Sequence, residues 1–188
     1  THAVLPTHWR EDLDGGFLGS FGGRVHRLDG LHGHVHLVPH RRPSSVSSPP
    51  RILVRRLQGD GVHDSDEIVA LPEDALDGVI TTLADENGYE GDAWGLDREL
   101  AAHDGVITQS VTLASEAALL GTPVLLISAG ERGFLDRLER EGAPLFRWRG
   151  PNDESEWGSI HAQFLAGLHL TDALEPAEWP DAKGQLLS

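Results

Sequence analysis

Residues 110–127 read SVTLASEAALLGTPVLLI, and this stretch decides the fold class that the sequence predicts. Its start is rich in hydroxyl groups and leads into a segment of small apolar residues, as in a buried helix. A Gly-Thr-Pro corner and a continuous apolar run then follow, as in a buried strand. The pattern predicts a helix over 112–120 and a strand over 123–128, with Ser110 as the helix N-cap.

Alternating strand and helix signals continue on both sides of this stretch. Strands are predicted over 51–57, 105–108 and 144–148, and helices over 72–88, 95–104, 131–142 and 153–168. Acids in the first turn and Asn-Gly at the end support the first of these helices. Such an alternation predicts an α/β fold, with a Rossmann-like parallel sheet covered by helices on both faces.

Composition divides the chain into three parts. Residues 1–30 are glycine-rich and irregular, with a strand-like start at AVLP. An alternating strand pattern over 31–40 and a Pro- and Ser-rich linker over 41–50 complete the first part, residues 1–50. We expect residues 51–170 to form the Rossmann-like domain. Residues 171–188 are predicted to be a tail without a closing element, which leaves truncation at this end open.

The charge balance excludes one class of partner and indicates an environment. The chain of 188 residues has 30 acidic and 15 basic side chains, and Lys183 is its only lysine. Because such a chain repels nucleic acid, we expect no nucleic-acid partner. Acid-rich, lysine-poor composition is typical of a salt-adapted cytoplasm, where ions screen the repulsion, and favours a halophilic archaeon or bacterium. The alternative is an ordinary acidic protein of a mesophile, which does not explain the near absence of lysine. No apolar run is long enough to span a membrane, so a cytoplasmic protein is predicted.

Two residue types are missing altogether. The absence of cysteine excludes disulfides, thiolate metal sites and cysteine nucleophiles. The absence of methionine, even at position 1, and of a signal-like start indicates a piece of a longer protein. The glycine motifs of P-loop and dinucleotide-binding proteins and the nucleophile elbow of hydrolases are also missing from the sequence.

The start of helix 112–120 is a candidate anion site. Helix N-termini present unpaired N–H groups and partial positive charge, here beside the hydroxyls of Ser110 and Thr112. Glu116 lies one turn further on the same side, where a carboxylate can accept hydrogen bonds from a ribose diol. The alternative from spacing alone is that Ser110 is only an N-cap and Glu116 only a solvated or capping acid.

The same stretch resembles the donor-binding segment in the C-terminal domain of GT-B proteins, the family of nucleotide-sugar glycosyltransferases and UDP-N-acetylglucosamine 2-epimerase. In particular, it resembles an uncharacterised, mainly archaeal GT-B-like family with the pattern Ser-Gly-Thr, three residues, then Glu-Ala-Ala-Leu-Leu-Gly-Thr-Pro. The resemblance covers most of 20–165, and ILVRRLQGDGVHD places an Arg and a His-Asp turn at a second family motif. The residues that match the first motif are Ser110, Thr112, Glu116, Ala117, Gly121, Thr122 and Pro123.

The resemblance implies the C-terminal half of a GT-B fold, which binds a UDP-sugar-like nucleotide sugar for glycosyl transfer or sugar epimerisation. In that family frame Ser110 and Thr112 would hold the diphosphate, Glu116 the ribose hydroxyls, and His63 would face the phosphates. The implied nucleotide-binding residues are Arg55, His63, Asp64, Ser110, Thr112 and Glu116. No separate cofactor is implied, and no catalytic residue is predicted. Much of the acid-base machinery belongs to an N-terminal Rossmann half, so we expect this chain alone to bind weakly and to be inactive.

Departures from the family pattern leave a second interpretation open. Val111 stands where the family has a glycine that lets the backbone approach a phosphate closely. The chain between Gly88 and Gly95 is shorter than the family pattern, in which a further strand is expected. Both features favour a non-catalytic GT-B-like domain that has lost its ligand.

A third interpretation rests on the histidines of 31–40. On a strand, His32, His34 and His36 would share one face, and three imidazoles could bind Zn²⁺ with an open fourth position. This would favour a His-rich metal-dependent hydrolase. Because the spacing alone is weak evidence and such histidines commonly face solvent, we predict no metal site.

Overall fold

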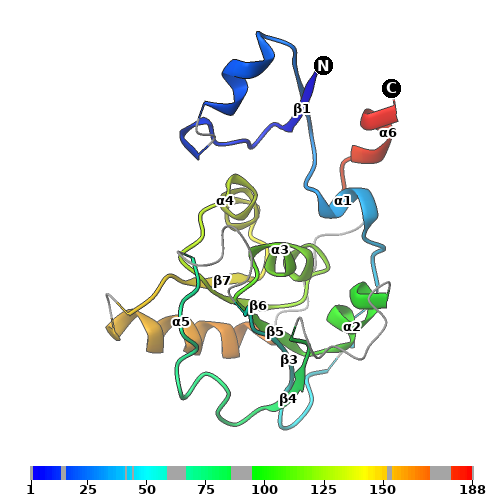
Figure 1. Ribbon diagram of the computed structural model, residues 1–188. Coiled ribbons are helices and arrows are strands. Elements are labelled where there is room, and N and C mark those ends of the chain that lie inside the picture. The colour runs from blue at the N-terminus through cyan, green and yellow to red at the C-terminus, as the bar shows by residue number, and fades with distance from the viewer. Residues whose placement is uncertain are drawn as a thin grey trace.

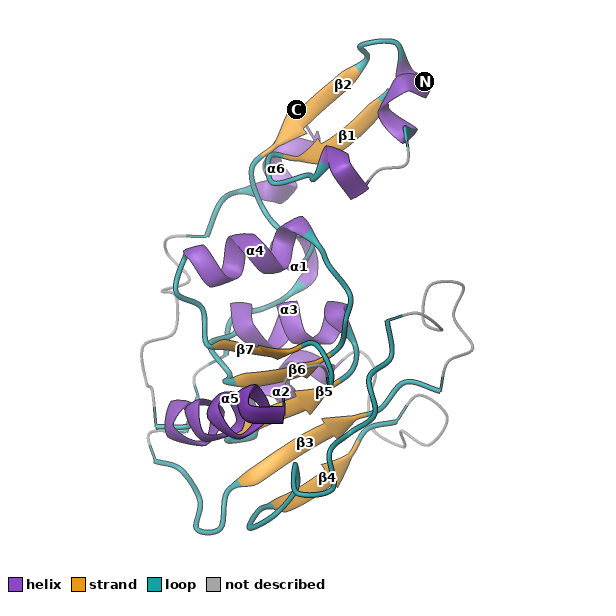
Figure 2. Ribbon diagram, turned by 90° about the vertical axis from the view of Figure 1, so that its left-hand side faces the viewer, coloured by secondary structure: helices purple, strands orange, loops and turns teal. Residues whose placement is uncertain are grey.

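A computed structural model defines the architecture of the protein (Figures 1 and 2). The residues that it describes are 2–13, 16–40, 42–43, 45–58, 67–85, 95–151, 154–169 and 179–187.

The larger sheet has five parallel strands in the order β4-β3-β5-β6-β7 (Figure 1). These strands are β3 (Arg51–Arg55), β4 (Ile80–Leu83), β5 (Gly105–Thr108), β6 (Val124–Ile127) and β7 (Leu145–Trp148). Figure 1 shows α3 and α4 above this sheet and α5 below it. The helices of this part are α2 (Leu96–Ala102), α3 (Val111–Leu119), α4 (Gly133–Arg140) and α5 (Glu154–Gly167).

Strand register explains why both faces of the sheet are covered. One row of neighbouring residues enters a core with α2, α3 and α4, and consists of Leu53, Val106, Val124 and Leu145. The next row packs with α5, and consists of Val54, Ile107, Leu125 and Phe146. Because side chains alternate along a strand, these continuous apolar runs bury both faces, as parallel sheets require. The predicted Rossmann-like α/β fold with helices on both faces is confirmed.

A smaller sheet lies apart from the larger one (Figure 2). Its two parallel strands are β1 (Ala3–Pro6), which the sequence predicts, and β2 (Val25–Leu28), which it does not. The short 3₁₀ helices η1 (Glu11–Leu13) and η2 (Phe17–Phe21) lie between them. Helix α6 (Ala182–Leu187) packs against β2, so the predicted tail without a closing element is wrong in this part.

The helix predicted over 72–88 is wrong. The chain forms turns over 73–78, and Gly78 has a φ of 74°, a left-handed conformation that ends any helix. Val79, Ile80, Thr81 and Thr82 follow, and this β-branched run becomes β4 because it pairs with the edge of β3. Residues 86–94, which include the region where the family pattern has a further strand, lie outside the described residues.

The strand predicted over 31–40 is also wrong, because Gly33–His36 forms the short helix α1. Leu37 N donates to Gly33 O over 2.9 Å, which closes one helical turn. Gly33 packs tightly against α3, since a Cβ there would lie 2.5 Å from Leu119 Cδ1. The segment therefore reaches α3 through a glycine, which is a tertiary contact that strand periodicity cannot show.

None of the helices in the described part of the chain is long and apolar enough to cross a membrane.

Candidate functional site

The order of the strands marks one edge of the larger sheet as a place for a ligand. From β3 the chain moves outward to β4 and then returns past β3 to β5. The direction changes between β3 and β5, and open α/β sheets bind ligands outside the carboxyl ends of the strands at such a point. Arg55 ends β3 and is paired in register with Thr108, which ends β5.

Ser110 follows β5 directly and caps α3. Its Oγ accepts a hydrogen bond from Leu113 N at 3.3 Å, and its own N–H donates to Thr108 Oγ1 at 3.0 Å. The predicted N-cap is therefore confirmed. Thr112 is exposed in the first turn, and Ser115 Oγ donates to the Thr112 carbonyl at 2.9 Å. The structure thus brings two of the predicted residues to the switch point, at a helix start with outward N–H groups.

Arg55 lies beside this helix start but leans toward β4. The side chain is partly exposed, and Nη1 donates to the carbonyl of Ala84 at 3.5 Å. Arg55 thus adds positive charge to the carboxyl edge. His63 and Asp64 lie outside the described residues.

Glu116 lies about 9 Å along α3 from Ser110, at a rise of about 1.5 Å per residue. Its side chain is 13% exposed, and Oε1 is 3.1 Å from Nε2 of His36 on α1. Glu116 therefore faces the segment before the larger sheet rather than bulk solvent.

The three-histidine face that a strand over 31–40 would present does not form. His34 turns away, since its Nδ1 accepts a hydrogen bond from Leu31 N at 2.9 Å and its ring packs on Trp179 at 5.0 Å. Because α1 is helical, His32 and His36 share a face instead, and Glu116 replaces His34 beside them.

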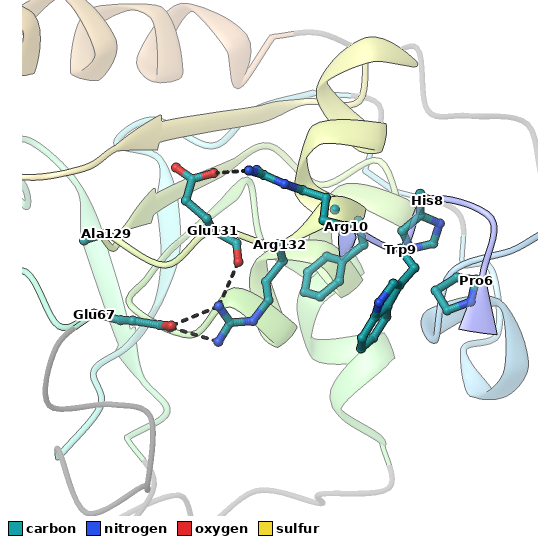
Figure 3. Close-up of a pocket in the computed structure, with 10 residues that line it drawn as sticks. Pro6, His8, Trp9, Arg10, Glu67, Ala129, Glu131 and Arg132 are labelled. Carbon is teal, nitrogen blue, oxygen red and sulfur yellow. Dashed lines mark hydrogen bonds and ion pairs between the residues drawn. The ribbon is translucent and has the colours of Figure 1, made fainter. Parts of the chain in front are cut away.

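A cavity of about 690 Å³ lies at the same carboxyl edge, between the loop after β1 and the loop after β6 (Figure 3). Its size is in the range of small-molecule sites. The residues that line it are Pro6, His8, Trp9, Arg10, Glu67, Ala129, Glu131, Arg132, Gly133 and Phe134. None of them is a predicted site residue. The signal that could have found them is GERG at 130–133, a polar run directly after the predicted strand 123–128.

Ion pairs hold the polar wall of the cavity (Figure 3). Arg132 donates from Nη1 and Nη2 to the two carboxylate oxygens of Glu67, at 2.9 and 3.0 Å, and from Nη1 to the Glu131 carbonyl at 2.9 Å. Arg10 Nη1 lies 3.6 Å from Glu131 Oε2. The segment before β4 is tied to the same edge, because Ala129 N and Ser128 Oγ both donate to the Glu67 carbonyl.

A buried arginine lies under this wall. The Arg147 side chain is 1% exposed and contacts Glu131 at 3.2 Å, Glu139 at 3.2 Å and Asp136 at 3.5 Å. Burial opposes ionisation of Glu131, but the hydrogen bond from Arg149 and the charge of Arg147 together lower the pKa of its carboxyl. The edge is therefore a network of compensated charges.

His8 contributes a neutral imidazole to the cavity. Burial, and then the charge of Arg137, lower the pKa of His8 to about 4. Its Nδ1 is buried with no hydrogen-bond partner among the described residues. The uncharged imidazole of His8, whose Nδ1 could form a hydrogen bond with a ligand, therefore lines the cavity.

Comparisons with protein-family models, with curated protein sequences and with solved structures found no match to this chain.

Proposed function

We propose that the chain binds a nucleotide sugar of the UDP-sugar class, as the nucleotide-binding half of a GT-B-like protein. The observation that carries this proposal is the position of Ser110. It caps α3 immediately after β5 and beside the switch point of the sheet. Nucleotides in doubly wound folds bind with their phosphates at such a helix start.

The diphosphate would lie at the start of α3. The unpaired N–H groups of the first turn and the hydroxyl of Thr112 would donate to its oxygens, and the helix dipole favours its charge. Arg55, at the end of the neighbouring strand, adds positive charge on the same edge. His63 and Asp64 join this set through the family resemblance.

The ribose would lie further along α3. Glu116 is about 9 Å from the N-cap at about 1.5 Å per residue, a separation that suits the step from diphosphate to ribose hydroxyls. Nε2 of His36 lies 3.1 Å from Oε1 of the carboxylate, which leaves Oε2 as an acceptor for the diol. The pair therefore orients the carboxylate before the ligand arrives.

The cavity one strand further along the edge offers space for the sugar. Its wall of paired guanidinium and carboxylate groups suits a ligand with several hydroxyls, which both donate and accept hydrogen bonds. The proposal concerns binding, because glycosyl transfer and sugar epimerisation both start from the same bound nucleotide sugar.

A charge substitution at the N-cap tests the diphosphate position. Ser110→Asp keeps a residue that caps helices well but places a negative charge where the diphosphate would bind. We expect UDP and UDP-N-acetylglucosamine, titrated calorimetrically at high salt, to lose about 100-fold in affinity, whereas uridine loses little. Equal losses for UDP and uridine would contradict the assignment, as would no loss at all.

Glu116→Ala tests the ribose position, with Glu99→Ala on α2 as the matched removal of an exposed acid. We expect about a tenfold loss of UDP affinity in the first variant and none in the second, because only Glu116 would contact the ligand. If the wild-type chain binds neither UDP nor UDP-N-acetylglucosamine, the result would favour the second interpretation, a GT-B-like domain that has lost its ligand.

That second candidate has a specific observation behind it. The side chain of Val111 packs against the core at the first position of α3, where the family pattern has a glycine. A Cβ at this point keeps a phosphate further from the backbone. Val111→Gly should therefore raise UDP affinity in a weak but working site and leave a lost site unchanged.

A further inference from the structure

We propose that His32, His36 and Glu116 form a binding site for a divalent transition-metal ion of the Zn²⁺ class, which joins α1 to α3. Their candidate ligand atoms all lie within 4.8 Å of one another. The site differs from the three-histidine face that the sequence allowed, because His34 has left it and a carboxylate from a distant helix has entered. Two imidazoles and one carboxylate are a ligand set that suits zinc.

The helical turn of α1 brings the two imidazoles together. His32 and His36 are four residues apart and therefore lie on one side of the helix. Their ring centroids are 4.7 Å apart and tilted by 54°, so the rings do not stack face to face. Histidines at this spacing on a helix are a known way to present two nitrogens to one zinc ion.

The hydrogen bond at Nδ1 of His36 decides which nitrogen faces Glu116 as a ligand. Nδ1 is 3.2 Å from the His32 carbonyl, which can only accept, so this contact favours the tautomer with the hydrogen on Nδ1. In the neutral ring Nε2 then has a lone pair, and this atom lies 3.1 Å from Glu116 Oε1. In that tautomer a metal ion bound by both Nε2 and Oε1 would satisfy the two acceptors.

The distances favour a metal with little rearrangement. Two ligand atoms of a tetrahedral zinc ion, each bonded at about 2.0 Å, are about 3.3 Å apart. The 3.1 Å between His36 and Glu116 is close to that value. Only His32 has to approach, and its exposed side chain can rotate. The carbonyl contact at Nδ1 of His36 is also the outer contact that orients metal-binding imidazoles.

The surroundings leave one coordination position for water. His32 is exposed and the side chain of His36 is 42% exposed, so the site opens to solvent on the side of α1. Three protein ligands and a water would complete a four-coordinate ion. The ion would fasten the segment before the larger sheet to α3, at the place where Gly33 already packs on Leu119.

Calorimetric titration of the metal-stripped chain with Zn²⁺ alone tests the site. The chain has no cysteine, so thiolates cannot compete, and molar ionic strength screens weak binding by its 30 acidic residues. We expect one Zn²⁺ per chain. Each of Glu116→Gln and His36→Ala should weaken binding by about 100-fold, because a ligand contributes at least as much as the outer contacts of a zinc site.

Two controls separate this site from the alternatives. His34→Ala should leave Zn²⁺ affinity unchanged, because His34 faces Trp179, whereas a three-histidine site would lose it. Ser110→Asp should also leave Zn²⁺ affinity unchanged, so failure of the nucleotide proposal and failure of the metal site are distinguishable. Circular dichroism of each variant confirms that it is folded. No Zn²⁺ binding at micromolar concentration, or wild-type affinity in Glu116→Gln, would overturn the site and leave His36 and Glu116 as a contact between two side chains only.

Discussion

The two sheets of this protein are both parallel but are buried to very different extents. Every residue of β5 and β6 is buried in the larger sheet, whereas β1 alternates between buried and exposed and no residue of β2 is buried. Parallel strands are stable where both faces are covered, and in the larger sheet α3 and α4 cover one face and α5 the other. The contrast indicates that the larger sheet contributes most to the stability of the fold, while the smaller sheet depends on contacts with neighbouring elements.

Those contacts lie next to the cavity. The loop after β1 reaches the start of α4, where Arg10 Nη1 donates to Asp136 Oδ2 at 3.1 Å. Gly133 allows this approach, because a Cβ there would lie 2.0 Å from the His8 carbonyl oxygen. The smaller sheet is therefore attached to the larger unit at the edge where we place the ligand.

The largest expected effect is a truncation in the larger sheet. Leu125→Ala removes a side chain that is 0% exposed between β6 and α5, and we expect it to lower the free energy of unfolding by about 3 kcal/mol. Val4→Ala in β1, where the side chain is 50% exposed, should lower it by less than about 0.5 kcal/mol. Urea unfolding of both variants measures the difference, and equal losses would show that the two sheets are equally important for stability.

A smaller effect is expected from the polar anchors of the two units. Buried Asp104 accepts hydrogen bonds at Oδ2 from Ser47 N at 3.2 Å and Arg51 N at 2.7 Å, which ties the linker to the start of β3. Asp104→Ala leaves these N–H groups without an acceptor and should lower the free energy of unfolding by about 2 kcal/mol.

The matched anchor of the smaller sheet is exposed. Gln185 on α6 exchanges two hydrogen bonds with the backbone of Asp29, at 2.9 and 3.0 Å. Water can replace an exposed amide, so Gln185→Ala should change the free energy of unfolding by less than about 0.5 kcal/mol. As a control for the buried anchor, Asp104→Asn keeps one side-chain oxygen and should recover part of the stability that Asp104→Ala loses. A loss in Gln185→Ala as large as that in Asp104→Ala would contradict the contrast.

A smaller effect than that of Asp104→Ala is expected from a pH dependence at the junction of the two units. The pKa of His8 is about 4 in the folded chain and 6.5 ordinarily, because burial, and then Arg137, disfavour the charged ring. Stability from neutral His8 is fully present above pH 6.5 and is lost as the pH falls toward 4, since the unfolded chain takes up the proton first. Because His8 is only half-buried, solvent screening limits the expected loss to about 1 kcal/mol.

Unfolding free energies at about pH 7 and about pH 5, measured for the wild type and for His8→Gln, isolate this contribution. The variant should lose less stability on acidification than the wild type, because the other titrating groups are common to both chains. The same loss in both chains would show that His8 is solvated in the folded state.

Local sequence signals were sufficient for the centre of the larger sheet. The strands after 105 and 123 and the helix between them are continuous apolar patterns closed by a cap and a Gly-Thr-Pro corner, and each signal lies within a few residues of the element that it predicts. Ser110 was found as an N-cap for the same reason, since its Oγ bonds to an amide only three residues away. Interactions of this kind join residues that are close together in the sequence, so a local pattern is enough to predict them.

Contacts between distant segments settled the remainder. Residues 80–83 form a strand because the edge of β3 is available to them, although acids and Asn-Gly around them favoured a helix. The cavity joins residues 6–10 to 129–134, and His36 meets Glu116 across 80 positions of the chain. The periodicity of the sequence does not predict contacts between such distant segments. They depend on the energy of packing whole elements against one another rather than on the secondary-structure preference of any one segment.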